Sequence, residues 1–230
     1  MRPINSSTRV DHLVYAATDL DRGLDEIEAL VGVRAAPGGQ HLGGGTHNAL
    51  LGLGPGVYLE IIAPDPDQPP PPQPRAFGLD SLSGSRLAAW AVTTTNVDAV
   101  VAQAQEKGIK LGEVQQGNRR RADGMQLRWR YTNPRTILAN GIVPFFIDWG
   151  QSPHPSLSAP TGATLVALRA EHPDEGGVQH MLRALNVDLP VTHAADPALV
   201  AVIDGRHGRV ELRTRATNRG RPASEDASGP

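Results

Sequence analysis

The segment THNALLGLGPGVYLEIIAP, residues 46–64, contains two apolar strands joined by a Gly-Pro-Gly turn, which is typical of a β-hairpin. Before it, VDHLVYAA, which starts at Val10, predicts a strand, and DLDRGLDEIEALVGV, which starts at Asp19, predicts a helix. The same order of strand, helix and hairpin recurs over 87–150 and 163–214. Because such a period indicates a fold built of repeats, we predict an α+β chain of similar modules.

Changes in composition separate these modules. A proline-rich stretch follows the first, and a shorter stretch rich in Ser and Pro follows the second. Asp19, Asn96 and Asp174 are suited to cap the N-termini of the three helices. The predicted organisation is an N-terminal extension (1–9), a first module (10–64), a Pro-rich linker (65–86), a second module (87–150), a linker (151–162), a third unit (163–214) and a disordered tail (215–230).

The third unit lacks a fourth module with which to pair. Its helix and strands carry apolar residues that need to be covered. We expect the unit either to pack beside the first two modules or to pair across a homodimer, and we favour the dimer.

The composition excludes several kinds of function. A net charge of −2 does not favour nucleic acid or an anionic membrane as a partner. Because the chain has no cysteine, any metal must be bound by His, Asp or Glu. We find neither a secretory signal nor an apolar run long enough to span a bilayer, and we expect a cytoplasmic protein. The run Arg119, Arg120, Arg121 lacks interleaved aromatic residues and is interpreted as a solvated loop.

Alternation along the strands indicates which side chains face the helices. In the first module, Leu13 and Leu59 belong to the helix side, which turns His12 and Glu60 to the other face. In the second module the large apolar residues are expected against the helix, namely Leu127, Trp129, Tyr131, Phe145, Ile147 and Trp149. The opposite face then carries Arg128, Arg130 and Asp148. If the two sheets curl together, these polar faces line a cleft between them.

His12 in VDHLVYAATDLDRGLDEI, Glu60 in GPGVYLEIIAPDP and the DWG that follows PFFI carry a resemblance to a known family. They resemble the glyoxalase-like branch of the vicinal oxygen chelate superfamily, over residues 10–150. The resemblance implies paired βαβββ modules that form a curved, incomplete barrel around a divalent metal ion, with the third, βαβββ-like unit at the C-terminal end. It also implies ligands from the first and fourth strands of each module and a substrate that chelates the ion through adjacent oxygens.

The implied metal ligands can be assigned residue by residue. His12 matches the first-strand ligand, Glu60 the fourth-strand ligand, and Asp148 the fourth-strand position of the second module. Aligning TDLD with TNVD places Ala89 opposite His12, and alanine cannot bind a metal. His47 is a further candidate ligand, provided that the Gly-Pro-Gly turn gives a register in which its side chain faces the cleft.

Several of these residues have a second interpretation. Asp148 can bind the metal and act as a catalytic carboxylate with Glu60, or it can simply pair with Arg128 or Arg130. If the two arginines are free, they suit an anionic substrate such as a 2-oxo acid. Asn48 can donate a hydrogen bond to a substrate oxygen, although asparagines near turns usually bind backbone groups.

Two functions follow from the resemblance. The first is a divalent-metal-dependent enzyme of the lyase, isomerase or dioxygenase type that acts on a small, oxygen-chelating substrate, with a carboxylate moving the proton. The alternative is a metal-free protein of the bleomycin-resistance type that binds or sequesters a small molecule, in which Ala89 marks a lost site. Fold alone does not choose among these chemistries.

Overall fold

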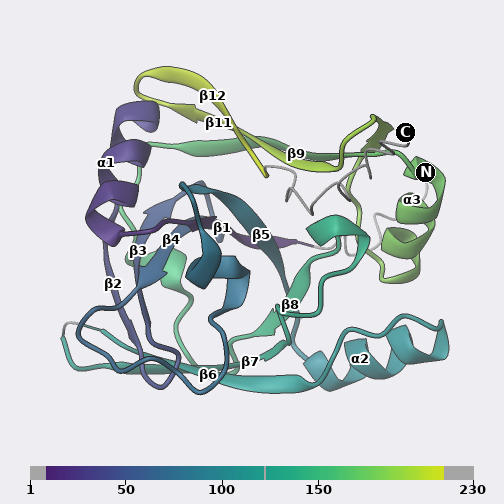
Figure 1. Cartoon of the computed structure of the whole chain (residues 1–230), viewed down its shortest axis with the longest axis horizontal. Helices are drawn as coiled ribbons and strands as arrows, with labels where there is room; N and C mark the ends of the chain where they lie inside the picture. Colours follow the sequence, from purple (N-terminus) through teal and green to yellow (C-terminus); the bar gives the residue numbers. More distant parts are fainter. Residues whose placement is uncertain (1–8, 122, 215–230) are drawn as a thin grey trace, which may run out of the picture.

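The computed structural model describes residues 9–121 and 123–214, and three units of one strand, one helix and three more strands follow one another in it (Figure 1). The first comprises β1 (Val10–Ala16), α1 (Leu20–Val31), β2 (Ala36–His41), β3 (Thr46–Gly52) and β4 (Tyr58–Pro64). The second comprises β5 (Arg86–Thr93), α2 (Val97–Glu106), β6 (Val114–Arg120), β7 (Gln126–Thr132) and β8 (Phe145–Asp148). The third comprises β9 (Thr164–His172), α3 (Glu175–Ala184), β10 (Val191–His193), β11 (Ala198–Gly205) and β12 (Gly208–Arg213). Short 3₁₀ turns occur at η1 (Ala76–Ser81), η2 (Ala139–Gly141) and η3 (Pro155–Leu157).

Two of the sequence-based expectations concern segments outside this range. The predicted disordered tail, 215–230, and residues 1–8 of the predicted N-terminal extension lie outside the described residues.

None of the helices that the structure describes is long and apolar enough to cross a membrane.

The strands of the first two units form one mixed barrel in the order β1-β4-β3-β2-β6-β7-β8-β5. In each unit the first strand runs parallel to the last, β1 with β4 and β5 with β8. The units meet along two seams: β1 pairs with β5 over most of its length, whereas β2 pairs with β6 through Gln40 and Arg120. We expected an incomplete barrel, but this second pairing closes it. Neither β2 nor β6 has the apolar alternation that would have predicted a strand.

The three helices begin where the sequence predicts. The side chains of Asp19, Asn96 and Asp174 each accept a hydrogen bond from a backbone N–H three residues further on. These bonds satisfy amide groups that have no partner within the helix, which stabilises each helix by about 1 kcal/mol. Gly32, with a φ of 76°, ends α1 in a left-handed conformation that glycine adopts without strain.

The main apolar core lies between the outside of the barrel and the helices. Leu13 of β1, Ile27 of α1 and Leu59 of β4 are fully buried there. Removing such a side chain from water stabilises the fold by roughly 1.5–3 kcal/mol. The predicted alternation of the first module is therefore confirmed: Leu13 and Leu59 face this core, whereas His12 and Glu60 face the barrel interior.

The third unit packs on the barrel within the same chain. Its sheet has the order β10-β9-β11-β12, and the β11–β12 hairpin lies beside α1 (Figure 1). The backbone N–H of Arg206 donates to the carbonyl oxygen of Val31 at 2.7 Å, and His207 Nδ1 lies 3.0 Å from the carbonyl oxygen of Ala29. Gly205 permits this approach, because a Cβ there would lie 2.3 Å from the oxygen of Val31. The third unit therefore packs beside the first two modules, and the homodimer stays a prediction.

Candidate functional site

The barrel encloses a cavity of about 360 Å³ that combines aromatic walls with a small group of polar side chains. The walls include six aromatic residues, Tyr58, Phe77, Trp129, Tyr131, Phe145 and Trp149. The polar side chains include His12, His41, Glu60 and Arg119. A concave apolar site with a few convergent polar groups is the usual form of a small-molecule site.

His12 projects into the cavity from β1. It is 3% exposed, and its ring stacks on Tyr58 with the centroids 4.7 Å apart. Its Nδ1 lies 2.6 Å from Oδ1 of Asp11, and its Nε2 lies 3.8 Å from Oε2 of Glu60. Because an ionised carboxylate only accepts hydrogen bonds, Asp11 requires the proton on Nδ1 and leaves Nε2 directed toward Glu60.

Asp11 is fully buried at a bulge where the register of β1 shifts against β5. Its carboxylate also accepts a hydrogen bond from Trp149 Nε1 at 3.1 Å and lies 3.1 Å from His154 Nε2. Burial alone would raise the pKa of Asp11, but hydrogen bonds from His12 and His154 and the charges of both imidazoles outweigh it. The pKa of Asp11 therefore lies well below its ordinary value, and the carboxylate stays ionised.

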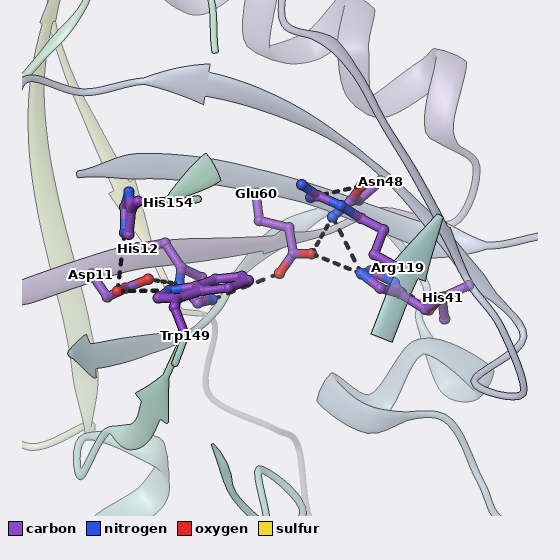
Figure 2. A network of polar contacts seen from close by, with 9 residues as sticks. Asp11, His12, His41, Asn48, Glu60, Arg119, Trp149 and His154 are labelled. Atoms are coloured by element: carbon purple, nitrogen blue, oxygen red, sulfur yellow. Dashed lines mark hydrogen bonds and ion pairs between the residues drawn. The ribbon is translucent and has the colours of Figure 1, made fainter. Parts of the chain in front are cut away.

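Glu60 lies between two imidazoles at the centre of this network (Figure 2). It is 8% exposed and projects from β4, the strand that runs parallel to β1. Its Oε2 faces His12, and its Oε1 accepts a hydrogen bond of 2.5 Å from the side-chain amide of Asn48 and lies 3.6 Å from His41 Nε2. One oxygen of this carboxylate is thus held by the protein, while the other faces His12 across a short gap.

His41 and Arg119 complete the polar group from strands that face each other across the second seam. Burial lowers the pKa of His41 to about 4, against the opposing charge of Glu60, so this imidazole is neutral near pH 7. The Asn48 amide donates to Glu60, and its oxygen lies 3.4 Å from a guanidinium nitrogen of Arg119. Asn48 therefore joins this network through its side-chain amide, and its contact with a substrate oxygen stays a prediction.

The prediction that Arg119 belongs to a solvated loop is wrong. Arg119 belongs to β6 and is 3% exposed, whereas the neighbouring Arg120 is exposed, as predicted. A strand turns alternate side chains to opposite faces, so the run of arginines is divided between the inside and the outside of the barrel.

Four residues predicted for the site are not brought to the cavity. His47 pairs with Ala63, and its Nδ1 lies 4.0 Å from Asp65, because the register of β3 and β4 turns Asn48 rather than His47 inward. Asp148, Arg128 and Arg130 line a separate groove on the outside of the barrel. Arg130 forms an exposed ion pair with Asp98 of α2, and the Asp148 carboxylate accepts from the backbone of Gly150.

The predicted face of the second module is reversed. Trp129 and Tyr131 of β7, with Phe145 and Ile147 of β8, line the cavity instead of packing on α2. The apolar residue that does face the helical core from β8 is Phe146. Because the barrel interior of this unit is itself aromatic, alternation identified the apolar face but not the layer against which it packs.

The donor atoms can be compared with what a divalent ion requires. His12 Nε2 and Glu60 Oε2, 3.8 Å apart, are close enough for one ion to bridge, but a protein-held site needs at least a third donor. In the second unit, Ala89 occupies the position equivalent to His12. Phe145 occupies the position equivalent to Glu60, because Phe145 pairs with Ala91 of β5 as Glu60 pairs with Val14 of β1, so the second unit supplies no donor at these positions. His41 approaches the other oxygen of Glu60, which Asn48 already occupies.

No group of three or more His, Asp or Glu side chains that could hold a metal occurs in the described part of the chain. The residues therefore do not fit a divalent ion held by His12, Glu60 and Asp148. What the site does provide is an oriented imidazole, a carboxylate facing it, and a buried guanidinium beside them.

Sequence reasoning missed Asp11, His41, Arg119 and His154. His41 and Arg119 lie on strands without a recognisable pattern, and His154 follows β8 in a segment interpreted as a linker. The one usable signal was the adjacency of Asp11 and His12, because a carboxylate next to an imidazole often fixes its tautomer.

Comparison with known proteins places the chain among related folds. A family model described as a glyoxalase-like domain matches residues 10–186. No curated protein matches the sequence. A hypothetical protein from Staphylococcus aureus is similar in structure, with a TM-score of 0.58 and 16% identity over 89% of this chain and 84% of its own.

Two further structures are methylmalonyl-CoA epimerases, and both are less similar in shape. A variant from Streptomyces coelicolor in complex with 2-nitronate-propionyl-CoA has 22% identity and a TM-score of 0.43 over 64% of this chain and 100% of its own. The enzyme from Mycobacterium tuberculosis has 19% identity and a TM-score of 0.41 over 64% of this chain and 92% of its own. At these identities the likeness concerns the fold alone.

Proposed function

The chain belongs to the glyoxalase-like family of the vicinal oxygen chelate superfamily, and we propose that it is an enzyme that moves a proton on a small, oxygen-bearing substrate held inside the barrel. The observation that carries this proposal is the approach of His12 Nε2 to Glu60 Oε2 at 3.8 Å within a buried cavity. An imidazole and a carboxylate that face each other in this way can act as a general acid and base on one bound molecule.

Each residue of the network has a role in this chemistry. Asp11 holds the Nδ1 proton of His12, so that Nε2 is the atom that takes a proton from the substrate or returns one to it. Asn48 holds one oxygen of Glu60 and leaves the other free to exchange a second proton. His154, which also lies against Asp11 and is 25% exposed, connects this pair to solvent.

A proton next to a carbonyl group is the kind that such a pair removes. When the pair carries one transferable proton, its deprotonated member takes the proton from the carbon while its protonated member donates to the carbonyl oxygen, which gives a neutral enol and leaves the protein with no net change in charge. The reverse transfer returns the proton to the same carbon or to its neighbour. No step in this scheme is routed through a metal ion.

A binding protein is the second candidate, and the aromatic lining favours it. Three of these rings form a cluster around Trp129. Its ring centroid lies 5.1 Å from that of Trp149 and 6.4 Å from that of Tyr131. Such walls bind flat apolar groups well without any chemistry. The two candidates differ in one measurable property, because a binding protein leaves the protons of its ligand unchanged.

Deuterium exchange tests the proposal. Hydroxyacetone and 2-oxobutyrate are incubated with the protein in D₂O, and loss of the proton signal next to the carbonyl is followed by NMR. We expect exchange above the buffer rate with the wild type, and a loss of at least about a hundredfold with His12→Gln and with Glu60→Gln. His47→Gln and Asp148→Asn are matched controls outside the cavity and should exchange like the wild type.

Two results would count against an enzyme of this kind. One is an exchange rate that is the same in His12→Gln, Glu60→Gln and wild-type protein. The other is ligand-induced thermal stabilisation without exchange, which supports the binding protein. Addition of EDTA should leave the exchange rate unchanged. If EDTA abolishes exchange and Mn²⁺ or Zn²⁺ restores it, the conclusion that these residues do not fit a divalent ion is wrong.

A further inference from the structure

The structure assigns Arg119 as the receptor for a negatively charged oxygen group, so that the cavity takes a small carboxylate-bearing molecule. This inference rests on the proposed function only for what happens to the ligand after it binds. Arg119 reaches the cavity from β6, and its side chain is as deeply buried as that of His12. A guanidinium presents five N–H donors in a planar fork that matches a carboxylate.

The hydrogen-bonding capacity of this guanidinium is largely unused. Its Nε is buried and has no partner, and one terminal nitrogen reaches Asn48 Oδ1 at 3.4 Å, a long contact. Among the residues that the structure describes, no carboxylate lies within ion-pair distance of it. Glu60 is the carboxylate whose charge acts on it, and the Asn48 amide bridges the two.

The local sequence makes room for this side chain. A Cβ at Gly38 would lie 3.1 Å from a terminal nitrogen of Arg119 and 2.2 Å from Asn48 Oδ1, and a Cβ at Gly39 would lie 3.2 Å from Arg119 Cγ. Two consecutive glycines of β2 thus form a cradle that any larger residue would fill. Gly39 also has a φ of 141°, which other residues rarely adopt.

A purely structural role does not account for this arrangement. Burying a charge without a partner costs several kcal/mol, and a fold gains nothing from such a charge unless something binds to it. Burial lowers the pKa of Arg119, while the charge of Glu60 opposes that effect, and the group keeps its proton at neutral pH. A buried cation with free donors beside a catalytic pair is the arrangement expected of a substrate-binding group.

The position of Arg119 also limits the substrate. Glu60 adjoins the same Asn48 amide, and His12 faces Glu60 from the other side. A carboxylate held by Arg119 therefore places the one or two carbons next to it near Glu60 and His12. Short 2-oxo and 2-hydroxy acids have this layout, and the aromatic walls accept an apolar substituent beyond those carbons.

Binding of a matched pair of probes tests the assignment. Phenylacetate and phenylacetamide have nearly the same shape, but only the first is charged, and their affinities are measured by titration calorimetry. We expect the wild type to prefer phenylacetate by about tenfold or more, and Arg119→Gln to bind the two equally. Arg119→Lys should keep part of the preference. Arg120→Gln, which alters the exposed neighbour, should keep all of it.

Thermal unfolding distinguishes a receptor from a structural residue. If Arg119 exists to bind an anion, Arg119→Gln and Arg119→Met unfold at the same temperature as the ligand-free wild type or a higher one. A large drop in both variants, an undiminished preference for phenylacetate in Arg119→Gln, or failure of the wild type to bind phenylacetate would each overturn the assignment. An Arg119-dependent preference without any deuterium exchange would uphold the assignment and refute the proposed enzyme.

Discussion

The imidazole of His41, whose side chain is 15% exposed, should make the protein less stable as the pH falls from 7 to 4.5. Burial lowers its pKa to about 4; the charge of Glu60 opposes this shift and that of Arg119 adds to it. In the unfolded chain the same group titrates near pH 6.5. Between these two pH values the unfolded chain binds more protons than the folded protein, so the free energy of unfolding decreases as the pH falls.

The size of the effect follows from the two pKa values. A pKa of about 4 in the folded protein and about 6.5 in the unfolded chain correspond to about 3 kcal/mol once the titration is complete, at about 1.36 kcal/mol per pKa unit. By pH 4.5 about 2 kcal/mol of this has been lost. Asp11 contributes little in this range, because its stabilisation is complete above the pKa of 3.8 that it has in the unfolded chain and is lost as the pH falls from there toward its lowered pKa in the folded protein.

Urea unfolding followed by tryptophan fluorescence at pH 7 and pH 4.5 measures the difference. The wild type should lose about 2 kcal/mol more than His41→Gln between the two pH values. His180→Gln, which changes an exposed histidine of α3, should behave like the wild type. If His41→Gln and the wild type lose the same amount, desolvation in the barrel does not lower the pKa of His41.

Two further variants test other parts of the structure. Asp11→Asn removes the charge that holds the Nδ1 proton of His12. We expect deuterium exchange to fall by at least about a hundredfold and the ¹⁵N NMR signals of His12 to show the other tautomer. Unchanged NMR signals would contradict this role of Asp11. Gly205→Ala places a Cβ 2.3 Å from the carbonyl oxygen of Val31 and should lower the free energy of unfolding by about 1–3 kcal/mol. Gly176→Ala is the control, because the space around Gly176 is open, and it should not lower the free energy of unfolding. Equal stability of the two variants would refute the close contact at Gly205.

The first module was predictable because its two faces differ in chemistry. Leu13 and Leu59 alternate with His12 and Glu60, so a period of two identified both the core and the polar pair. The family resemblance then added the expectation that this pair shares one cavity, and their separation of 3.8 Å agrees with it.

The second module was not predictable in the same way because both of its layers are apolar. Trp129 and Tyr131 line the cavity, and Phe146 packs on the helical side, so alternation could not say which set faces inward. Charged residues gave the wrong answer for a related reason. Arg130 lies outside, where water and Asp98 solvate it, whereas the buried Arg119 belongs to a run that looks equally solvated in sequence.

The remaining members of the site depend on contacts between distant parts of the chain. Asp11 and His154 are 143 residues apart, and Asn48 and Arg119 are 71 apart. No local pattern connects such positions. They meet because closure of the barrel brings β2 beside β6 and because the segment after β8 folds back over β1.

The hairpin that lies against α1 limits how the protein can be shortened or assembled. In a fragment that stops at residue 150, the side of α1 that now meets Gly205 and Arg206 would be exposed to water. Such a fragment is a poor substitute for the whole chain in ligand screening or crystallisation. For the same reason, two copies of the intact protein that associate must do so through some other surface, since this flank is already occupied from within.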